Sequence, residues 1–132
     1  MTERAMQATL AVSGAWLVVT GLLAMVAPDT FFDQIGRYGV ENSHYVGDVG
    51  AFQLAAGLGL WVAIVRPAFR VPMLVVGVFW FGLHALNHLF DVGEARSDGR
   101  GWLDTILLAL GAVGSGWLAS QAARLERGEG AG

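Results

Sequence analysis

The chain of 132 residues contains no cysteine and no lysine, and few of its residues are charged. Without cysteine there is no disulfide, no thiolate metal ligand, no iron–sulfur ligation and no cysteine nucleophile. Charged residues make up 14% of the chain, against about a quarter in a typical soluble domain, which is too little to coat a water-soluble globule. The net charge is −3 and no basic run is present, so we expect no nucleic-acid partner.

Apolar residues are abundant, at 55% of the chain, and they gather in four long runs. A helix needs roughly 20 such residues to cross the hydrocarbon core of a bilayer. Because the backbone in lipid must satisfy its own hydrogen bonds, these runs are expected to be helices. The predicted spans cover residues 8–27, 46–65, 71–92 and 102–120 of a single transmembrane domain, 1–132. We expect residues 124–132 to form a flexible tail.

Four spans joined by short connections predict an all-α fold, an antiparallel four-helix transmembrane bundle surrounded by the lipid bilayer. In the first outer loop, Phe31, Phe32 and Ile35 at helical spacing follow a cap signal at Asp29 and Thr30. This pattern predicts a short interfacial helix there. Such a bundle is compatible with a homo-oligomer or a larger membrane complex.

The distribution of arginine predicts the orientation. An even number of spans puts both termini on one side of the membrane, and that side carries five of the eight arginines. The five are Arg4, Arg66, Arg70, Arg124 and Arg127, and the three on the opposite side are Arg37, Arg96 and Arg100. Since the more positive side is usually cytoplasmic, we expect an inner-membrane protein with both termini in the cytoplasm.

Small residues at regular spacing predict where the helices touch, because close approach is what holds helices together in lipid. These stripes are Gly14 and Gly21 in the first span, Ala51, Ala55 and Gly59 in the second, and Gly111 and Ser115 in the fourth. At about 100° per residue, Asp48 falls on the second of these stripes and Asp104 on the third. We therefore expect both acids to point toward neighbouring helices.

The third span carries four polar residues at spacings of three and four, within an arc of about 100° on one helical face. They are His84, Asn87, His88 and Asp91. Asp48 and Asp104 begin the second and fourth spans from the same outer side, and His44 directly precedes the second. The topology therefore predicts one polar site near the outer face, with Trp80, Phe81 and Asn87 as its wall.

Several chemistries fit this cluster. Two histidines one turn apart can bind a divalent transition metal, with a carboxylate from another helix completing the site. Haem, with His84 or His88 as an axial ligand, is a second hypothesis. A small-ligand or proton-linked site is a third, because histidine titrates near neutrality. The alternative is a hydrogen-bonded network that only fixes helix packing, in a non-catalytic accessory subunit.

Two segments, together with the order of the four spans, resemble the DoxX-like group of small bacterial four-helix membrane proteins. Residues 44–53 (HYVGDVGAFQ) open the second span, and His84…His88…Asp91 closes the third. The resemblance covers most of the chain, from Ala8 to Ser120. Because the name-giving members resemble subunits of quinone-linked sulfur oxidation, it implies a redox-linked or accessory role. It implies no agreed catalytic residues, and the cysteines of some redox members are missing here.

Overall fold

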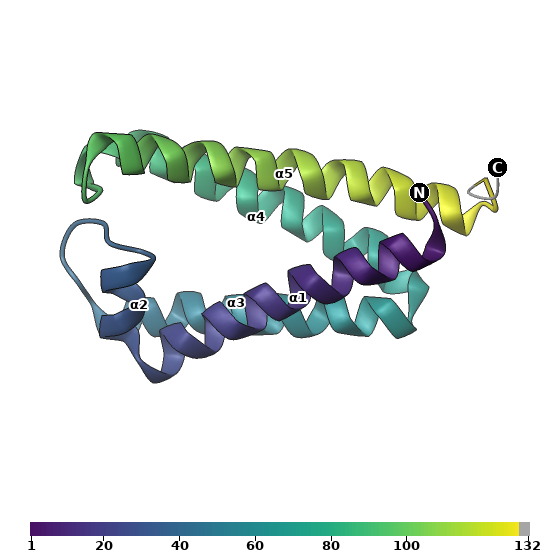
Figure 1. Cartoon of the computed structure of the whole chain (residues 1–132), viewed down its shortest axis with the longest axis horizontal. Coiled ribbons are helices and arrows are strands. Elements are labelled where there is room, and N and C mark those ends of the chain that lie inside the picture. Colours follow the sequence, from purple (N-terminus) through teal and green to yellow (C-terminus); the bar gives the residue numbers. More distant parts are fainter. Residues whose placement is uncertain (130–132) are drawn as a thin grey trace.

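The computed structural model describes residues 1–129, and within them the chain forms five α-helices, two short 3₁₀ helices and no strand. The α-helices are α1 (Glu3–Val26), α2 (Pro28–Gln34), α3 (Ser43–Val65), α4 (Arg70–Phe90) and α5 (Asp98–Glu126) (Figure 1). The 3₁₀ helices are Pro67–Phe69 and Val92–Glu94. Within this part of the chain, α1, α3, α4 and α5 lie in four segments that are long and apolar enough to cross a membrane, which confirms the four predicted runs.

Each of the four long helices begins before its predicted apolar run, and polar residues cap the start of three of them. Thr2, Asn42 and Ser97 accept hydrogen bonds from backbone N–H groups of the first turns of α1, α3 and α5. Such bonds satisfy donors that a helix start leaves open. At its other end α5 continues to Glu126, into the segment predicted to be flexible. Residues 130–132 of that segment lie outside the described residues.

Helices α1 and α3 approach each other through glycines, so closely that backbone meets backbone. A methyl group added at Gly57 would lie 2.7 Å from the carbonyl oxygen of Gly14, and one at Gly21 would lie 2.6 Å from the amide nitrogen of Leu54. A methyl group added at Gly50 would likewise lie 2.8 Å from the carbonyl oxygen of Gly21. The predicted role of Gly14 and Gly21 in packing is therefore confirmed.

The predicted packing stripe on α3 is a contact surface only at Gly59, which contacts Met73 of α4. Its other members, Ala51 and Ala55, are exposed, so the prediction is wrong for them. The face that meets α1 runs through Gly50 and Gly57. Both sets of small residues are regularly spaced, but only Gly50 and Gly57 have glycines of α1 opposite them.

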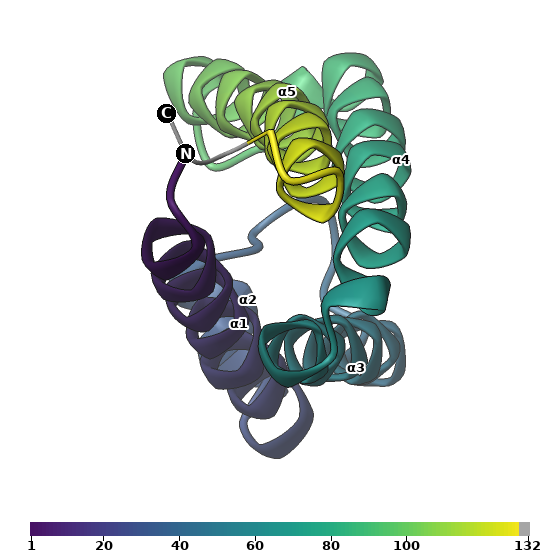
Figure 2. The same ribbon diagram turned by 90° about the vertical axis from the view of Figure 1, so that its right-hand side faces the viewer.

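Helices α4 and α5 form a second closely packed pair. Gly77 of α4 lies against Ser115, with 3.0 Å from its ideal Cβ to the serine oxygen, and Gly111 of α5 lies against the ring of Phe81. The predicted stripe of Gly111 and Ser115 thus contacts a neighbouring helix. The structure is built from two pairs, α1 with α3 and α4 with α5, as the end-on view shows (Figure 2).

The two pairs are joined most firmly at the end where both termini lie, called the terminal end here (Figure 1). A buried apolar cluster there draws on all four long helices, through Met6, Leu10, Leu60, Ala63, Leu74 and Ala122. Beside it, the side chain of Arg70 is 2% exposed. Its guanidinium donates to Glu3 of α1 at 2.8 and 2.5 Å and to the carbonyl oxygen of Ala63 in α3 at 3.1 Å. This ion pair therefore ties three helices together.

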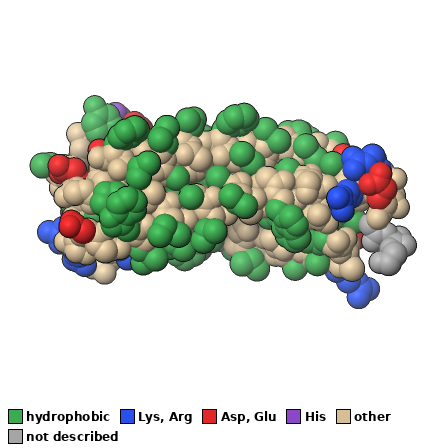
Figure 3. Space-filling view, turned by 90° about the horizontal axis from the view of Figure 1, so that it is seen from above, with side chains coloured by type: hydrophobic (Ala, Val, Ile, Leu, Met, Phe, Trp, Pro, Cys, Tyr) green, Lys and Arg blue, Asp and Glu red, His purple; other side chains and the backbone are tan. Residues whose placement is uncertain are grey.

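Charged side chains gather at the two ends of the long axis, while apolar side chains cover the middle (Figure 3). The opposite end from the termini, where α2 and the loops lie, is called the loop end. Many large apolar residues of the middle are exposed, among them Val12, Phe79, Leu83 and Val113. An apolar belt between two charged ends is what a bilayer requires of a protein that crosses it.

The glycine contacts predict how adding a methyl group at two positions of α3 changes the stability. Replacing Gly57 with Ala should lower the free energy of unfolding by about 1–3 kcal/mol, because the added methyl group overlaps the α1 backbone. Gly47, on the same helix, has nothing within 4 Å of its ideal Cβ, so Gly47→Ala should cost nothing and benefit from the higher helix propensity of alanine. Unfolding in mixed micelles of increasing SDS content measures both variants, and equal effects would contradict the packing.

Candidate functional site

The predicted histidines of α4 do come together. His84 and His88, one turn apart, lie with their Nε2 atoms 3.0 Å from each other, a hydrogen bond whose direction depends on the tautomers. Their ring centroids are 4.7 Å apart. The Nδ1 atom of each ring is buried and has no hydrogen-bond partner among the described residues. All hydrogen bonding of this histidine pair is therefore concentrated between the two Nε2 atoms.

Tyr38, in the loop between α2 and α3, covers the histidine pair at the loop end. Its ring stands edge-on to that of His88, with centroids 4.3 Å apart. Its hydroxyl donates to Asp104 of α5 at 3.2 Å, and Asp104 also accepts from Arg100 at 2.9 Å. The hydrogen bonds of Asp104 thus come from this loop and from its own helix, and Tyr38 is a site residue that the sequence reasoning missed.

The backbone of the same loop fastens it to the second helix pair. Gly39 donates from its N–H to the carbonyl oxygen of Glu94 at 3.1 Å, and Tyr38 and Ala95 form an isolated β-bridge. The φ of Gly39 is +56°, a left-handed conformation that glycine adopts without strain. The loop that follows α2 therefore bridges the two pairs at the loop end.

Of the other predicted site residues, His44 and Asp48 lie apart from the histidine pair. His44 and Asp48 form an ion pair of 3.6 Å on the surface of α3, with side chains 79% and 67% exposed. The prediction that Asp48 points toward a neighbouring helix is wrong, because the α1-facing glycines set a different rotation of α3. Asp91 accepts a hydrogen bond of 3.1 Å from Asn87, which is exposed and does not wall the histidine site.

No group of three or more metal-ligating side chains comes together within residues 1–129. The histidine pair alone offers two nitrogen donors. Haem would take one Nε2 as an axial ligand, and the neighbouring Nε2 at 3.0 Å would then have to move aside. The metal and haem hypotheses remain predictions on this geometry.

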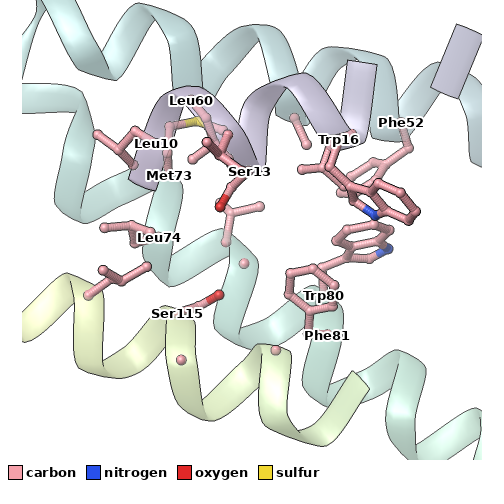
Figure 4. Close-up of a pocket in the computed structure, with 18 residues that line it drawn as sticks. Leu10, Ser13, Trp16, Phe52, Leu60, Met73, Leu74, Trp80, Phe81 and Ser115 are labelled. Carbon is pink, nitrogen blue, oxygen red and sulfur yellow. The ribbon is translucent and has the colours of Figure 1, made fainter. Parts of the chain in front are cut away.

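A cavity of about 470 Å³ lies between the two helix pairs, near the middle of the four long helices. All four contribute to its lining, which is almost entirely apolar (Figure 4). Its aromatic end consists of Trp16, Phe52, Trp80 and Phe81, and its aliphatic end includes Leu10, Leu60, Met73, Leu74 and Leu118. The closest backbone contacts lie within the α1–α3 pair, whereas the two pairs meet around the cavity only through side chains such as Met73 and Trp80 of α4.

The aromatic end of the cavity adjoins the histidine pair. The ring of Trp80 lies 6.0 Å from that of His84, and it packs against Phe52 at 5.2 Å and Phe81 at 4.7 Å. Trp80 and Phe81, predicted as the wall of the histidine site, therefore line the deeper cavity. His84 is not among the residues that line it.

The chain matches no protein-family model, no curated protein and no solved structure with which it was compared. The resemblance to the DoxX-like group remains a prediction.

The surroundings of Tyr38 predict its titration. Burial raises the pKa of Tyr38 to about 12, and the nearby carboxylate of Asp104 adds to this effect. The fold favours the neutral phenol. The stability that the neutral Tyr38 phenol contributes to the fold is therefore complete below about pH 10, the ordinary pKa of tyrosine, and is lost as the pH rises through about 12.

The chain has two tyrosines, so Tyr45→Phe leaves Tyr38 alone to report. Phenolate absorbance of this variant should rise with a midpoint near 12. A second substitution, Asp104→Asn, should lower that midpoint because it removes the negative charge. A midpoint at the ordinary value in the Tyr45→Phe variant would mean that the loop does not cover the histidine pair.

Proposed function

We propose that the chain is an antiparallel four-helix transmembrane bundle that binds a lipophilic small molecule in the cavity between its helix pairs. The single observation that carries this proposal is the cavity itself. Its volume of about 470 Å³ falls within the range of about 300–1,000 Å³ that is usual for small-ligand sites. Its apolar lining suits a molecule that partitions into the bilayer.

The position of the cavity supports entry from the side. Val12 and Trp16 line the cavity and are also 71% and 65% exposed on the surface of α1. Both lie in the middle of α1 (Glu3–Val26), at the level that a bilayer would cover. A lipophile would therefore pass from the acyl chains into the cavity without crossing water.

In this proposal the chain lies in the inner membrane with the terminal end in the cytoplasm, α2 lies at the outer interface, and the histidine pair is near the outer face. Five of the eight arginines near the terminal end favour this orientation. A redox-linked role, as the DoxX-like resemblance implies, and assembly into a homo-oligomer or larger complex are compatible with it. The competing hypothesis is an accessory subunit whose polar groups only fix packing, and it predicts that the cavity binds nothing.

A cavity-filling variant separates the two hypotheses. Gly114 lines the cavity and has nothing within 4 Å of its ideal Cβ, so leucine there should occupy the ligand's space without disturbing the helices. Benzophenone is a lipophilic photoreactive probe, and irradiation in lipid nanodiscs followed by peptide mass spectrometry shows where it attaches. We expect attachment at cavity residues, reduced about tenfold or more by Gly114→Leu, equivalent to about 1.4 kcal/mol of binding.

Gly47→Leu is the matched control, since Gly47 also has open space but lies outside the cavity. It should label like the unmodified chain. Attachment spread evenly over the outer surfaces, and equal in both variants, would contradict the proposal.

The histidine pair favours a second candidate function, the binding of a divalent transition-metal ion. With metal–nitrogen bonds of about 2.0–2.1 Å, two nitrogens on one ion lie about 2.9 Å apart at a right angle and about 3.3 Å apart in a tetrahedron. The observed 3.0 Å between the Nε2 atoms of His84 and His88 is close to the first of these separations, which copper(II) and nickel(II) prefer. The ion would replace the shared proton, with water or a ligand in its other positions.

Copper(II) titration of the detergent-purified chain by calorimetry tests this candidate. We expect one ion per chain, abolished by His84→Ala and retained in His44→Ala, because His44 lies exposed on α3. Unchanged binding in His84→Ala, or loss in His44→Ala alone, would show that the pair is only a hydrogen bond between neutral rings.

A further inference from the structure

Two hydroxyl groups interrupt the apolar lining of the cavity. They belong to Ser13 of α1 and Ser115 of α5, which lie between its aromatic and aliphatic ends (Figure 4). Ser115 is only 9% exposed. The two serines come from helices of different pairs, so their hydroxyls face the space between the pairs from both sides.

Other hydroxyls of these helices bond to the backbone of their own helix. Thr9, Thr20 and Thr105 each donate to a carbonyl oxygen four residues earlier at 2.9 Å, and Ser120 donates to that of Trp117 at 2.7 Å. This is the usual arrangement for a hydroxyl in apolar surroundings, where an unmade hydrogen bond is costly. The hydroxyls of Ser13 and Ser115 make no hydrogen bond to any described residue. Both are therefore free to donate to a molecule in the cavity.

The two ends of the cavity favour different parts of a ligand. At the aromatic end, Trp80 packs against Phe52 and Phe81, and Trp16 lies opposite from α1. Stacked and edge-on contacts with such rings favour a flat ring system. The leucines and Met73 of the other end offer no polar or aromatic partner and suit an aliphatic segment.

From this arrangement we infer the class of ligand, an inference that rests on the proposed function. The ligand is a ring-bearing lipophile with a carbonyl or ether oxygen, and its ring lies at the aromatic end between Trp16 and Trp80. The oxygen accepts a hydrogen bond from Ser13 or Ser115. Any aliphatic part extends toward Leu10 and Leu74. The two serines are thus specificity-determining residues, since a pure hydrocarbon leaves both hydroxyls without a partner.

A matched pair of probes tests the role of the hydroxyls. Benzophenone carries a carbonyl between two rings, and diphenylmethane has nearly the same shape without the oxygen. Titration of photolabelling in nanodiscs gives the affinity of benzophenone, and displacement of benzophenone gives that of diphenylmethane, both per mole of lipid. In the unmodified chain, benzophenone should bind several-fold more tightly than diphenylmethane.

Ser13→Ala and Ser115→Ala should each weaken benzophenone binding several-fold, and together about tenfold or more, with diphenylmethane unchanged. Ser120→Ala is the control, because that hydroxyl is bonded to its own helix outside the cavity. It should alter neither affinity. Circular dichroism and the unchanged diphenylmethane affinity report that the variants remain folded.

The outcomes of these titrations distinguish a failure of this inference from a failure of the proposed function. Attachment of benzophenone in the cavity with no preference over diphenylmethane, or with a preference that the serine variants keep, overturns the inference and leaves the proposed function standing. Absence of attachment at any cavity residue overturns the proposed function and this inference with it.

Discussion

The structure depends on small residues that let the helices within each pair approach closely. In lipid there is no hydrophobic reason for helices to associate, so packing at short range must hold them. Gly14 and Gly21 of α1 meet Gly57 and Gly50 of α3 at distances that leave no room for a methyl group. Helices α4 and α5 approach each other where Gly77 lies against the side chain of Ser115. Each pair is therefore closely packed, and other contacts join the two pairs.

Contacts at both ends join the two pairs. At the terminal end, an apolar cluster and the Arg70–Glu3 ion pair close the bundle. At the loop end, Tyr38 reaches across to His88 and Asp104. In the middle the pairs meet through side chains, Met73 against Gly59 and Trp80 against Phe52, around the cavity. An apolar space between two closely packed pairs that are joined at both ends is what the proposed lipophile site requires.

Much of this arrangement was predictable from the sequence, and the rest depends on tertiary contacts that residue spacing does not reveal. The four spans follow from the length of the apolar runs, and helical periodicity predicts the packing role of Gly14 and Gly21 and the proximity of His84 and His88. Asp48 was misplaced because α3 carries two regular sets of small residues, and only the opposing glycines of α1 select between them. Tyr38 was missed because the path of a loop depends on tertiary contacts, such as the bond from Gly39 to Glu94, that leave no periodic signal. The cavity could not be foreseen either, since it depends on how the side chains of the two pairs pack against each other.

The central claim is that the space between the pairs persists in a bilayer and is filled by something other than the protein's own side chains. Solid-state NMR of the chain in lipid bilayers tests it, by measuring which protons transfer magnetisation to the side chain of Ser115. The account predicts transfer from acyl chains or a bound lipophile to this residue, although it is only 9% exposed in the chain alone, and no direct contact with Ser13. Contact between Ser13 and Ser115 without any signal from a lipophile would mean that the pairs collapse onto each other and that the cavity does not exist.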